Sequence, residues 1–442
     1  MIKLPEQVNK AICLLKSSGF EAYAVGGAVR DCLLGKVPFD WDITTSARPE
    51  ETEKVFCGER IIETGIKHGT VTVIIDGMPL EITTYRIDGD YTDHRHPQTV
   101  SFSDNLRDDL SRRDFTINTL CCNCDDKIVD AFGGKDDLKN KTIRCVGDPD
   151  TRFSEDALRI MRAVRFSAEL GFKIEKSTSD SILKNRQLLS DVSKERLQVE
   201  FTKLITGKYA TDVIRKYHAV IEVFIPEIAP LIGCEQHTKY HKYDVFEHTL
   251  HAVDAVDFND RILRLTMFFH DFGKPDAKTT DENGTSHFKG HAVISEKKTR
   301  DILKRLKFDN NTINEVSKLV LIHDMKSPRD KIQAKKMMCS LGDEAYLNLI
   351  KIKRADNMAK ADPHAIDEKL KNMLSFYEEI KASNECYNLK SLAINGDDIK
   401  AFGIAEGKEI KSSLDFLLNG VIEGKCQNRK DVLLEYLKEN TK

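Results

Sequence analysis

The chain has 442 residues, of which 40% are hydrophobic and 31% are charged, and this length allows roughly two to four domains. It contains no run of about 18 apolar residues and no secretion signal, so we expect a cytoplasmic protein that has no membrane partner. The net charge of −3 argues against a uniformly basic nucleic-acid coat, and the irregular spacing of the 11 cysteines predicts reduced thiols.

The first 145 residues alternate short β-type runs with helical stretches and turns. The β-type runs are AYAV, TVTVII and LEITTYR. From Ser154 onward the apolar residues recur with helical spacing almost throughout. We therefore expect an α+β protein, with a mixed sheet and helices at the N-terminus followed by all-α segments.

A glycine turn lies early in the first region, in the segment YAVGGAVRDCLLG. It predicts a strand, a turn at Gly26 and Gly27, and a helix that begins near Ala28. Free N–H groups at such a turn and the positive end of the helix dipole suit a triphosphate, and Arg30 can add a bidentate contact. A turn without function is the alternative.

The stretch PFDWDI follows a short loop. On one extended strand, Asp40 and Asp42 point to the same face, roughly 6.6 Å apart. Two such carboxylates can share a pair of Mg²⁺ ions, one activating an attacking 3' hydroxyl and one holding the leaving pyrophosphate. Two solvated acids on an edge strand are the alternative, but Trp41 and Ile43 make the other face apolar and favour the metal site.

Together these motifs resemble the signature of class II tRNA nucleotidyltransferases, in the polymerase β superfamily. Further motifs follow in the order of that family: LSRRDFTINTL, EDALRIMRAVRF and ERLQVE. The resemblance implies a polymerase-β-like head, a helical neck and body, Mg²⁺ at the head, and CTP, ATP and the tRNA 3' end as partners.

The resemblance also implies roles for two further head residues. Arg113 would contact the incoming nucleotide; the alternative is an arginine that supports Asp114 in a turn. Glu81 would be the third acid of the site, although an exposed strand position fits it equally.

In the EDALR motif, a helix would place Asp156 and Arg159 on one face. One acceptor and one forked donor then suit the amino group and ring nitrogen of cytosine and adenine, and the wrong base would leave polar groups unpaired, at about 1–3 kcal/mol each. A surface ion pair is the alternative. By resemblance, Arg162 and Arg165 reach the phosphates, with one of them alternatively holding the neck.

Two further stretches have expected roles. Glu195, Arg196 and Glu200 are interpreted as an ion-pair network that supports the neck. The polar stretch between Arg86 and Leu110 has the length of a functional or disordered loop. In the family, a loop here helps to switch specificity from C to A, so its presence favours full CCA addition or A addition over CC addition.

A histidine-rich stretch at 235–365 resembles the HD phosphohydrolase domain through VFEHTLHAV, FFHDFGKP, FKGHAV, LVLIHD and RADNMA. We assign His248, His270, Asp271 and Asp356 to a first ion. His291, His323 and Lys274 are candidates for a second ion or for substrate phosphate. Ligands rich in histidine favour Mn, Ni, Co, Fe or Zn.

The expected domains are a nucleotidyltransferase head (1–145), a helical neck and tRNA-binding body (146–234), the HD domain (235–365) and a helical tail (366–442). Three alternatives stay open at this point: an enzyme that adds only A or a bacterial poly(A) polymerase, a nucleotide or cyclic-phosphate hydrolase with a nucleotide-binding head, and a noncatalytic RNA-binding protein. The retained Asp40 and Asp42 argue against the last two.

Overall fold

The computed structural model describes residues 2–63, 65–66, 69–89, 100–125, 127–238, 240–404 and 407–440. The chain divides into two compact units, Met1–Pro226 and Glu227–Lys442. The boundaries between the four predicted domains stay predictions.

The first unit is built on a mixed seven-stranded sheet. Its neighbours pair antiparallel except β2 and β5, which run parallel. The predicted runs AYAV and TVTVII are β1 and β4, and most of LEITTYR lies in β5. In sheet order the strands are β3 (Arg60–Ile62), β4 (Thr70–Ile75), β5 (Met78–Thr84), β2 (Asp42–Thr45), β1 (Ala22–Val25), β8 (Cys121–Cys122) and β9 (Ile128–Val129).

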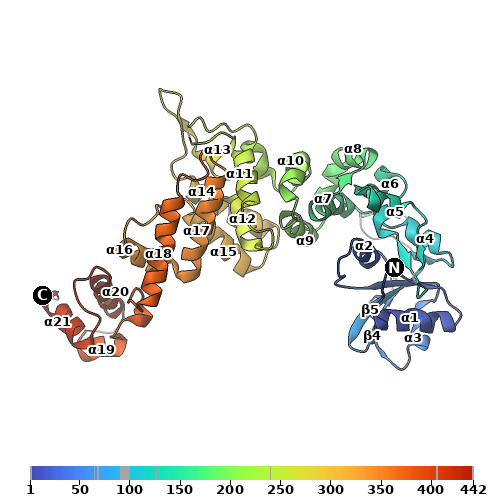
Figure 1. Cartoon of the computed structure of the whole chain (residues 1–442), viewed down its shortest axis with the longest axis horizontal. Coiled ribbons are helices and arrows are strands. Elements are labelled where there is room, and N and C mark those ends of the chain that lie inside the picture. Colours follow the sequence, from blue (N-terminus) through green and yellow to red (C-terminus); the bar gives the residue numbers. More distant parts are fainter. Residues whose placement is uncertain are drawn as a thin grey trace. The chain divides into compact units, whose positions relative to one another are not determined.

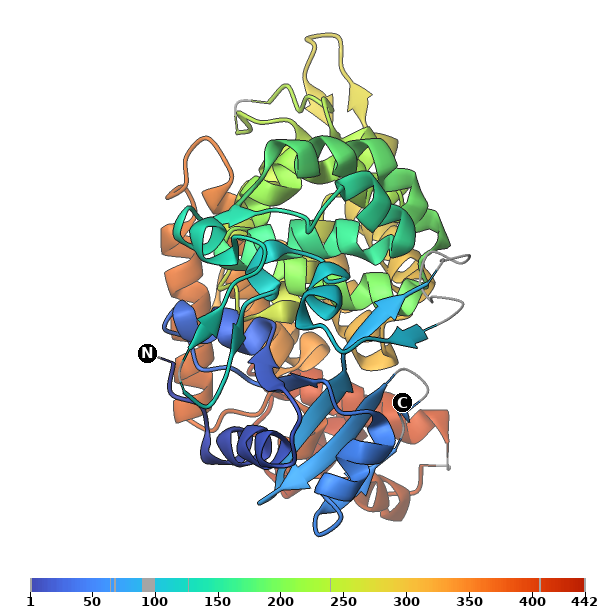
Figure 2. The same cartoon turned by 90° about the vertical axis from the view of Figure 1, so that its right-hand side faces the viewer.

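Helices α1 (Glu6–Ser17) and α3 (Pro49–Val55) pack on this sheet (Figure 1). Alternate residues of β4 (Val71, Val73 and Ile75) are buried, as the period of two along a strand requires. The same blue helices and strands lie together in the turned view (Figure 2). This layer holds β2 and β5 in a fixed register.

The rest of the first unit is mostly helical, with two short strand pairs, β6 (Arg86–Asp88) with β7 (Val100–Phe102) and β10 (Thr142–Ile143) with β11 (Lys173–Ile174). Its other helices are α2 (Gly27–Leu33), α4 (Leu106–Ser111), α5 (Gly134–Lys139), α6 (Pro149–Glu155), α7 (Leu158–Leu170), α8 (Lys176–Asn185), α9 (Lys194–Ile205) and α10 (Ala210–Ile221).

The predicted helix through EDALR is wrong at its start. Helix α6 ends at Glu155, Asp156 has extended backbone angles, and α7 begins at Leu158. Pro149 starts α6 with Asp148 as its N-cap, and the Asp156 side chain accepts from the Leu158 N–H at the start of α7. An aspartate that caps the following turn competes with a continuous helix, and this explains the break.

The second unit is helical apart from the hairpin β12 (Thr279–Thr280) and β13 (Ser286–His287). A separate apolar cluster around Ile399, Leu417 and Leu433 closes its C-terminal part. Within the described residues, no helix is both long and apolar enough to cross a membrane. The helices are α11 (Val245–Asp254), α12 (Arg261–Phe269), α13 (Lys274–Ala277), α14 (His291–Arg305), α15 (Asn310–Ile322), α16 (Lys331–Leu341), α17 (Asp343–Met358), α18 (Asp367–Ala382), α19 (Gly396–Ala401), α20 (Lys408–Ile422) and α21 (Lys430–Asn440).

Candidate functional site

The glycine turn joins β1 to α2. Gly26 has φ +83°, a conformation that disfavours any side chain. A Cβ there would stand 3.4 Å from Nη1 of Arg113 and 3.8 Å from Oδ2 of Asp42. The glycine therefore lets the backbone approach two of the predicted site residues.

Of the three predicted acids, Asp40 and Asp42 lie beside this turn, whereas Glu81 lies on the far side of Asp42 and does not line the cleft at the turn. Strand β2 begins at Asp42, so Asp40 lies in the segment before the strand instead of on it. Asp42 pairs in register with Glu81 of β5, which places these two residues side by side. All three acids are solvent-exposed residues.

The electrostatics of Asp42 reflect this crowding. Partial desolvation raises the pKa of its carboxyl to about 6, with Arg113 acting in the opposite direction and Glu81 and Asp40 adding to the rise. Carboxylates that repel one another in this way are stabilised by a bound cation. Hard oxygen ligands of this kind suit Mg²⁺.

A cleft of about 730 Å³ opens beside the acids in the first unit. It gathers predicted residues that are far apart in sequence: Gly27, Arg30, Asp40, Asp42, Arg113, Arg162 and Arg165.

Three of the arginines surround one aromatic ring in this cleft. The guanidinium carbons of Arg30, Arg162 and Arg165 lie 4.9, 5.3 and 3.6 Å from the centre of the Phe166 ring. Contact with this ring holds the three positive charges together at one wall of the cleft. Such a wall suits a polyphosphate.

Carboxylates hold two of these arginines, Arg162 and Arg165, in place. Arg162 binds Asp114 at 2.7 Å, and Arg165 binds Glu200 and Glu169, each at 2.8 Å. Burial opposes ionisation of Asp114, but the pair with Arg162 and a hydrogen bond from Asn118 outweigh it and lower the Asp114 pKa to about 2. Each arginine is thus both anchored and presented to the cleft.

Arg113 does not pair with Asp114, the acid considered in the sequence analysis, but with another acid. Its Nη2 lies 3.2 Å from Oδ2 of Asp109, whereas Asp114 pairs with Arg162. The alternative of an arginine that supports Asp114 is therefore wrong. The predicted contact of Arg113 with a nucleotide stays a prediction.

Asp156 and Arg159 are both engaged within the protein. Asp156 pairs with Arg196 at 3.1 Å, and the Arg159 guanidinium donates to Glu155 at 2.8 Å and to the Arg112 carbonyl at 2.6 Å. Of the predicted ion-pair network, Arg196 and Glu200 do form ion pairs, with Asp156 and Arg165, whereas Glu195 forms none with the residues that the structure describes. The role of Asp156 and Arg159 at a base stays a prediction, without a shared helix face to support it.

Sequence reasoning missed Asn118, Phe166 and Lys203 in this cleft. Asn118 accepts from Arg30 at 2.8 Å and donates to Asp114 at 2.9 Å, so it joins two charged residues of the wall. Its place in the motif DFTIN, beside Arg113 and Asp114, was the available signal. The loop assigned to the C-to-A switch has its centre, residues 90–99, outside the described residues.

The second unit holds a buried cluster of imidazoles and carboxylates, here called the His–Asp cluster. It combines two triplets whose ligand atoms lie within 4.8 Å of one another, His248 with His270 and Asp271, and Asp271 with His291 and His323. Asp356 joins it through His248, with Nε2 3.0 Å from Oδ1. The predicted ligands come from α11, the ends of α12 and α15, the start of α14, and α17.

Each histidine of the cluster is oriented by a backbone carbonyl near its Nδ1. The carbonyls are those of Ala359 for His248 at 3.2 Å, Met267 for His270 at 2.7 Å, Phe288 for His291 at 2.8 Å and Val320 for His323 at 2.6 Å. An Nδ1–H that donates to a carbonyl leaves the Nε2 lone pair facing the cluster. This is the arrangement of histidines that bind metals.

The polar atoms inside the cluster fit a cation. Both ring nitrogens of His248 face oxygen atoms, Nδ1 the Ala359 carbonyl and Nε2 the Asp356 carboxylate, while burial lowers the pKa of the ring. His270 Nε2 is buried without a well-directed hydrogen bond, 3.1 Å from Oδ2 of Asp271. Nitrogen lone pairs and carboxylate oxygens repel one another at these distances. A divalent ion bound between them would replace this repulsion by attraction.

Two lysines complete the cluster. Lys274 lies 2.7 Å from Oδ2 of Asp271 and donates to Gln236 at 2.7 Å, so its ammonium is engaged inside the protein. Lys360, which the sequence analysis missed, pairs with Asp356 at 2.6 Å. Its spacing of four residues from Asp356 on one helix was a usable signal.

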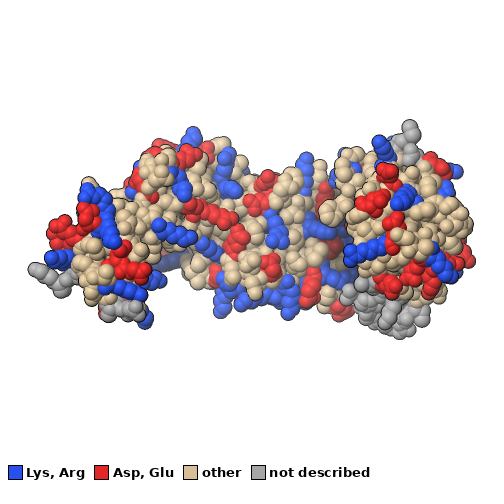
Figure 3. All heavy atoms as spheres, turned by 90° about the horizontal axis from the view of Figure 1, so that it is seen from below, with Lys and Arg blue, Asp and Glu red and all other residues tan. Residues whose placement is uncertain are grey.

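One face of the molecule carries charges of both signs, and this agrees with the expectation that the chain has no uniformly basic coat. Basic and acidic side chains are interspersed on the face shown in Figure 3. Charge at the level of the whole chain therefore says less about partners than the local sets in the cleft and the cluster.

Comparisons with known proteins agree with the observed fold. Family models match at residues 22–144 (Poly A polymerase head domain), 171–232 (probable RNA and SrmB-binding site of polymerase A) and 279–437 (putative tRNA nucleotidyltransferase domain 2). The fold and the cleft thus define a nucleotidyltransferase.

Similar proteins identify the family within the nucleotidyltransferases. The CCA-adding enzymes of Lactobacillus helveticus and Geobacillus kaustophilus are each 33% identical, over 99% of this chain and 98% and 97% of theirs. The crystal structure of the Bacillus stearothermophilus CCA-adding enzyme in complex with CTP is 30% identical, with a TM-score of 0.72 over 98% of this chain and 97% of that one. The chain belongs to the CCA-adding enzyme family.

Proposed function

We propose that this protein builds or repairs the CCA end of tRNA, adding C, C and A from CTP and ATP without a nucleic-acid template. The observation that carries the proposal is the placement of Asp42 and Glu81 side by side in register, with Asp40 two residues away, next to a glycine turn and an arginine-lined cleft. Membership of the CCA-adding enzyme family supports the substrate assignment.

In this proposal, Asp40, Asp42 and Glu81 hold two divalent cations, with Mg²⁺ the expected metal. When bound, such ions lower the pKa of the attacking 3' hydroxyl and neutralise the leaving pyrophosphate. The raised pKa of Asp42 means that its carboxyl binds a proton more readily than an isolated aspartate does. Ion binding then competes with protonation near pH 6.

The remaining cleft residues orient the triphosphate. The backbone at Gly27 and the guanidinium groups of Arg30, Arg113, Arg162 and Arg165 provide hydrogen-bond donors and positive charge. Because carboxylates anchor Arg162 and Arg165, these groups need little reorganisation when the phosphates arrive. Asp156 and Arg159 are proposed to select cytosine and adenine, with the loop around residues 90–99 switching between them.

Nucleotide addition to three tRNAs tests this proposal. The tRNAs end at the discriminator base, at C and at CC, and CTP and ATP are supplied separately. We expect CTP to extend the first two, ATP to extend the third by one residue, and growth to stop there. Extension by ATP alone identifies an A-adding enzyme, and a lengthening A tail identifies a poly(A) polymerase.

We also propose a second activity, metal-dependent phosphohydrolysis at the His–Asp cluster, as the resemblance to the HD domain predicts. The inward lone pairs of its histidines and the buried Asp271 support a site for Mn, Ni, Co, Fe or Zn. On a 2',3'-cyclic phosphate, water would bond to phosphorus, the bond to O3' would break, and O3' would take the proton. The products are a 2'-phosphate and the free 3' hydroxyl that the head extends.

Joint replacement of His270 and Asp271 by Ala tests this activity. We expect loss of phosphohydrolysis and of stoichiometric metal binding, with CCA addition to a tRNA that has a free 3' hydroxyl retained. Absence of hydrolysis by the unmutated protein with each of the five metals would remove the second activity.

A further inference from the structure

A basic pocket adjoins the His–Asp cluster in the second unit. It has a volume of about 470 Å³, within the range of pockets that hold small ligands. It shares Asp324, Asp356, His323 and Lys360 with a smaller cleft of about 380 Å³ that opens onto the cluster. A molecule in the pocket would therefore lie against the proposed metal centre.

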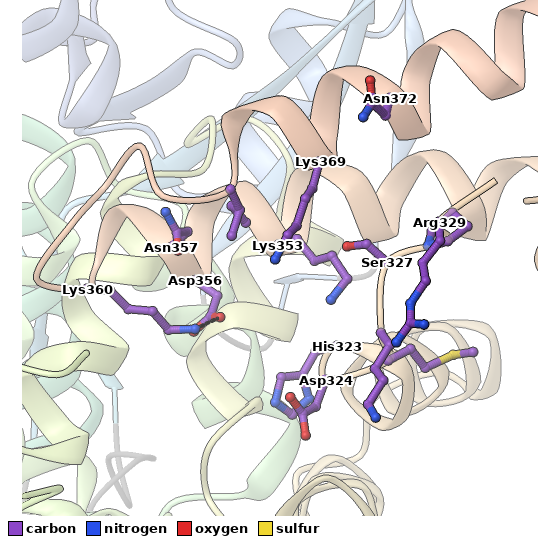
Figure 4. Close-up of a pocket in the computed structure, with 14 residues that line it drawn as sticks. His323, Asp324, Ser327, Arg329, Lys353, Asp356, Asn357, Lys360, Lys369 and Asn372 are labelled. Atoms are coloured by element: carbon purple, nitrogen blue, oxygen red, sulfur yellow. Dashed lines mark hydrogen bonds and ion pairs between the residues drawn. The ribbon is translucent and has the colours of Figure 1, made fainter. Parts of the chain in front are cut away.

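The pocket carries more positive than negative charge. Asp324 and Asp356 are its two acids, whereas five basic side chains from three different segments of the fold line it: Lys326, Arg329, Lys353, Lys360 and Lys369. Figure 4 labels all of these except Lys326. This excess of cations indicates an anionic occupant.

Within the described part of the chain, four of the five cations form no ion pair. Lys360 pairs with Asp356, but Lys326, Arg329, Lys353 and Lys369 form no ion pair with any residue in the described ranges. Lys326, Arg329 and Lys369 are exposed at the rim of the pocket, whereas Lys353 is half-buried. Figure 4 shows the side chains of Lys353 and Arg329 on facing sides of the pocket.

Lys353 is the least hydrated of these groups. It is only partly exposed, and desolvation lowers its pKa, although Asp356 and Asp324 act in the opposite direction. A charged amine held away from water without an ion-pair partner is unfavourable unless an anion joins it. This cost is removed when a phosphate oxygen binds.

The remaining walls suit the other parts of a nucleotide. Met325, Pro328 and Ile366 offer apolar contact for a base or ribose, while Ser327 and Asn372 offer hydrogen bonds. The pocket thus combines cations that suit a phosphate with apolar side chains that suit a base or a ribose.

We propose that this pocket binds the 5'-side phosphate of a nucleotide whose 3'-side phosphate lies at the His–Asp cluster. The inference rests on the proposed phosphohydrolase function and names its substrate class: nucleotides with phosphate on both sides of the ribose. A phosphate-ended RNA and a free nucleoside 3',5'-bisphosphate share this chemistry.

Binding measurements without metal test the proposal. Calorimetry in EDTA compares cytidine 3'-monophosphate, cytidine 3',5'-bisphosphate and a cytidine dinucleotide that ends in a 3'-phosphate. We expect a ligand with the second phosphate to bind about tenfold more tightly than the monophosphate, which corresponds to about 1.4 kcal/mol. A preference for the dinucleotide identifies an RNA end as the source, and a preference for the bisphosphate identifies a free nucleotide.

The chain offers a matched control on one helix. Lys369 and Lys371 both lie on α18 and both are exposed, but only Lys369 lines the pocket. We expect the Arg329→Gln/Lys369→Gln variant to lose the preference, and Lys371→Gln to keep it. Because the head also binds nucleotides, the difference between these variants isolates the pocket.

Two results overturn the inference: equal affinity of the unmutated protein for the three ligands, and equal loss of the preference in the Lys371→Gln control. Failure of the phosphohydrolase proposal would give a different result from failure of this inference. In that case no metal supports hydrolysis, yet the preference for a second phosphate and its dependence on Lys369 persist.

Discussion

The cleft of the first unit and the His–Asp cluster of the second are both suited to metal ions and phosphates, but they are built in opposite ways. In the cleft, exposed acids are placed by strand register, and the arginines are held by buried or half-buried carboxylates. In the cluster, the ligands are themselves buried, and backbone carbonyls at helix ends fix each imidazole.

This difference bears on what each site can do. An open row of acids beside a cleft of about 730 Å³ leaves room for a triphosphate and a polynucleotide end. The buried cluster leaves little freedom to its candidate ligands, so the proposed metal site would be more selective, and a substrate would reach it through the adjoining pockets. The variants below test whether the two sites are as separate as this contrast implies.

The largest effect is expected from Asp42→Asn. Loss of one charge from the acid group should lower the rate of both C and A addition by on the order of a thousandfold, about 4 kcal/mol of transition-state stabilisation. Metal binding in the second unit should not change. Single-turnover addition with a Mg²⁺ titration measures the effect.

Asp180→Asn is the control, because Asp180 forms only an exposed pair with Lys176 on α8. It should stay within about twofold of the unmutated rate, as expected for a surface ion pair. Full addition by Asp42→Asn at saturating Mg²⁺ would contradict the assignment of the acids.

A smaller effect is expected from Arg159→Ile. If Arg159 reads the base edge, discrimination against UTP and GTP should fall by about tenfold, the equivalent of one lost hydrogen bond, while triphosphate affinity changes less. Kinetics with all four nucleotides provide the measurement. An equal loss for every nucleotide would show that Arg159 has a structural role, through the contacts with Arg112 and Glu155 seen in the structure.

The sequence predicts the α+β class, the main strands and many of the residues that the structure gathers in the cleft and in the His–Asp cluster. Local patterns suffice for these, since the alternation in TVTVII and the motif order do not depend on tertiary contacts. The register that brings Glu81 beside Asp42 could not be read from either segment, because β2 and β5 are separated by two other strands in the chain. The resemblance supplied Glu81 where periodicity alone left its role open.

The errors have local physical causes. Asp156 was placed within a helix from the spacing of EDALR, but its side chain caps the next turn and pairs with Arg196, forty residues later in the chain. Asp40 was placed on a strand that begins two residues later. The basic pocket next to the cluster had no motif at all, since Arg329, Lys353 and Lys369 come from separate segments that only folding assembles.

The smallest effect concerns Asp114, the carboxylate that anchors Arg162 in the cleft wall. Its folded-state pKa of about 2 lies below the ordinary value of 3.8, so its stabilising contribution is present above pH 4 and is lost as the pH falls towards 2. The shift corresponds to about 2 kcal/mol at pH 7 and to about 1 kcal/mol less at pH 3. We therefore expect the difference in unfolding free energy between the unmutated protein and Asp114→Asn to shrink by about 1 kcal/mol between pH 5 and pH 3. The single tryptophan, Trp41, is buried in the first unit, so its fluorescence during urea unfolding reports on that unit. Asp180→Asn again serves as the control, and parallel pH profiles for the Asp114→Asn and unmutated proteins would show that Asp114 does not anchor the wall through its charge.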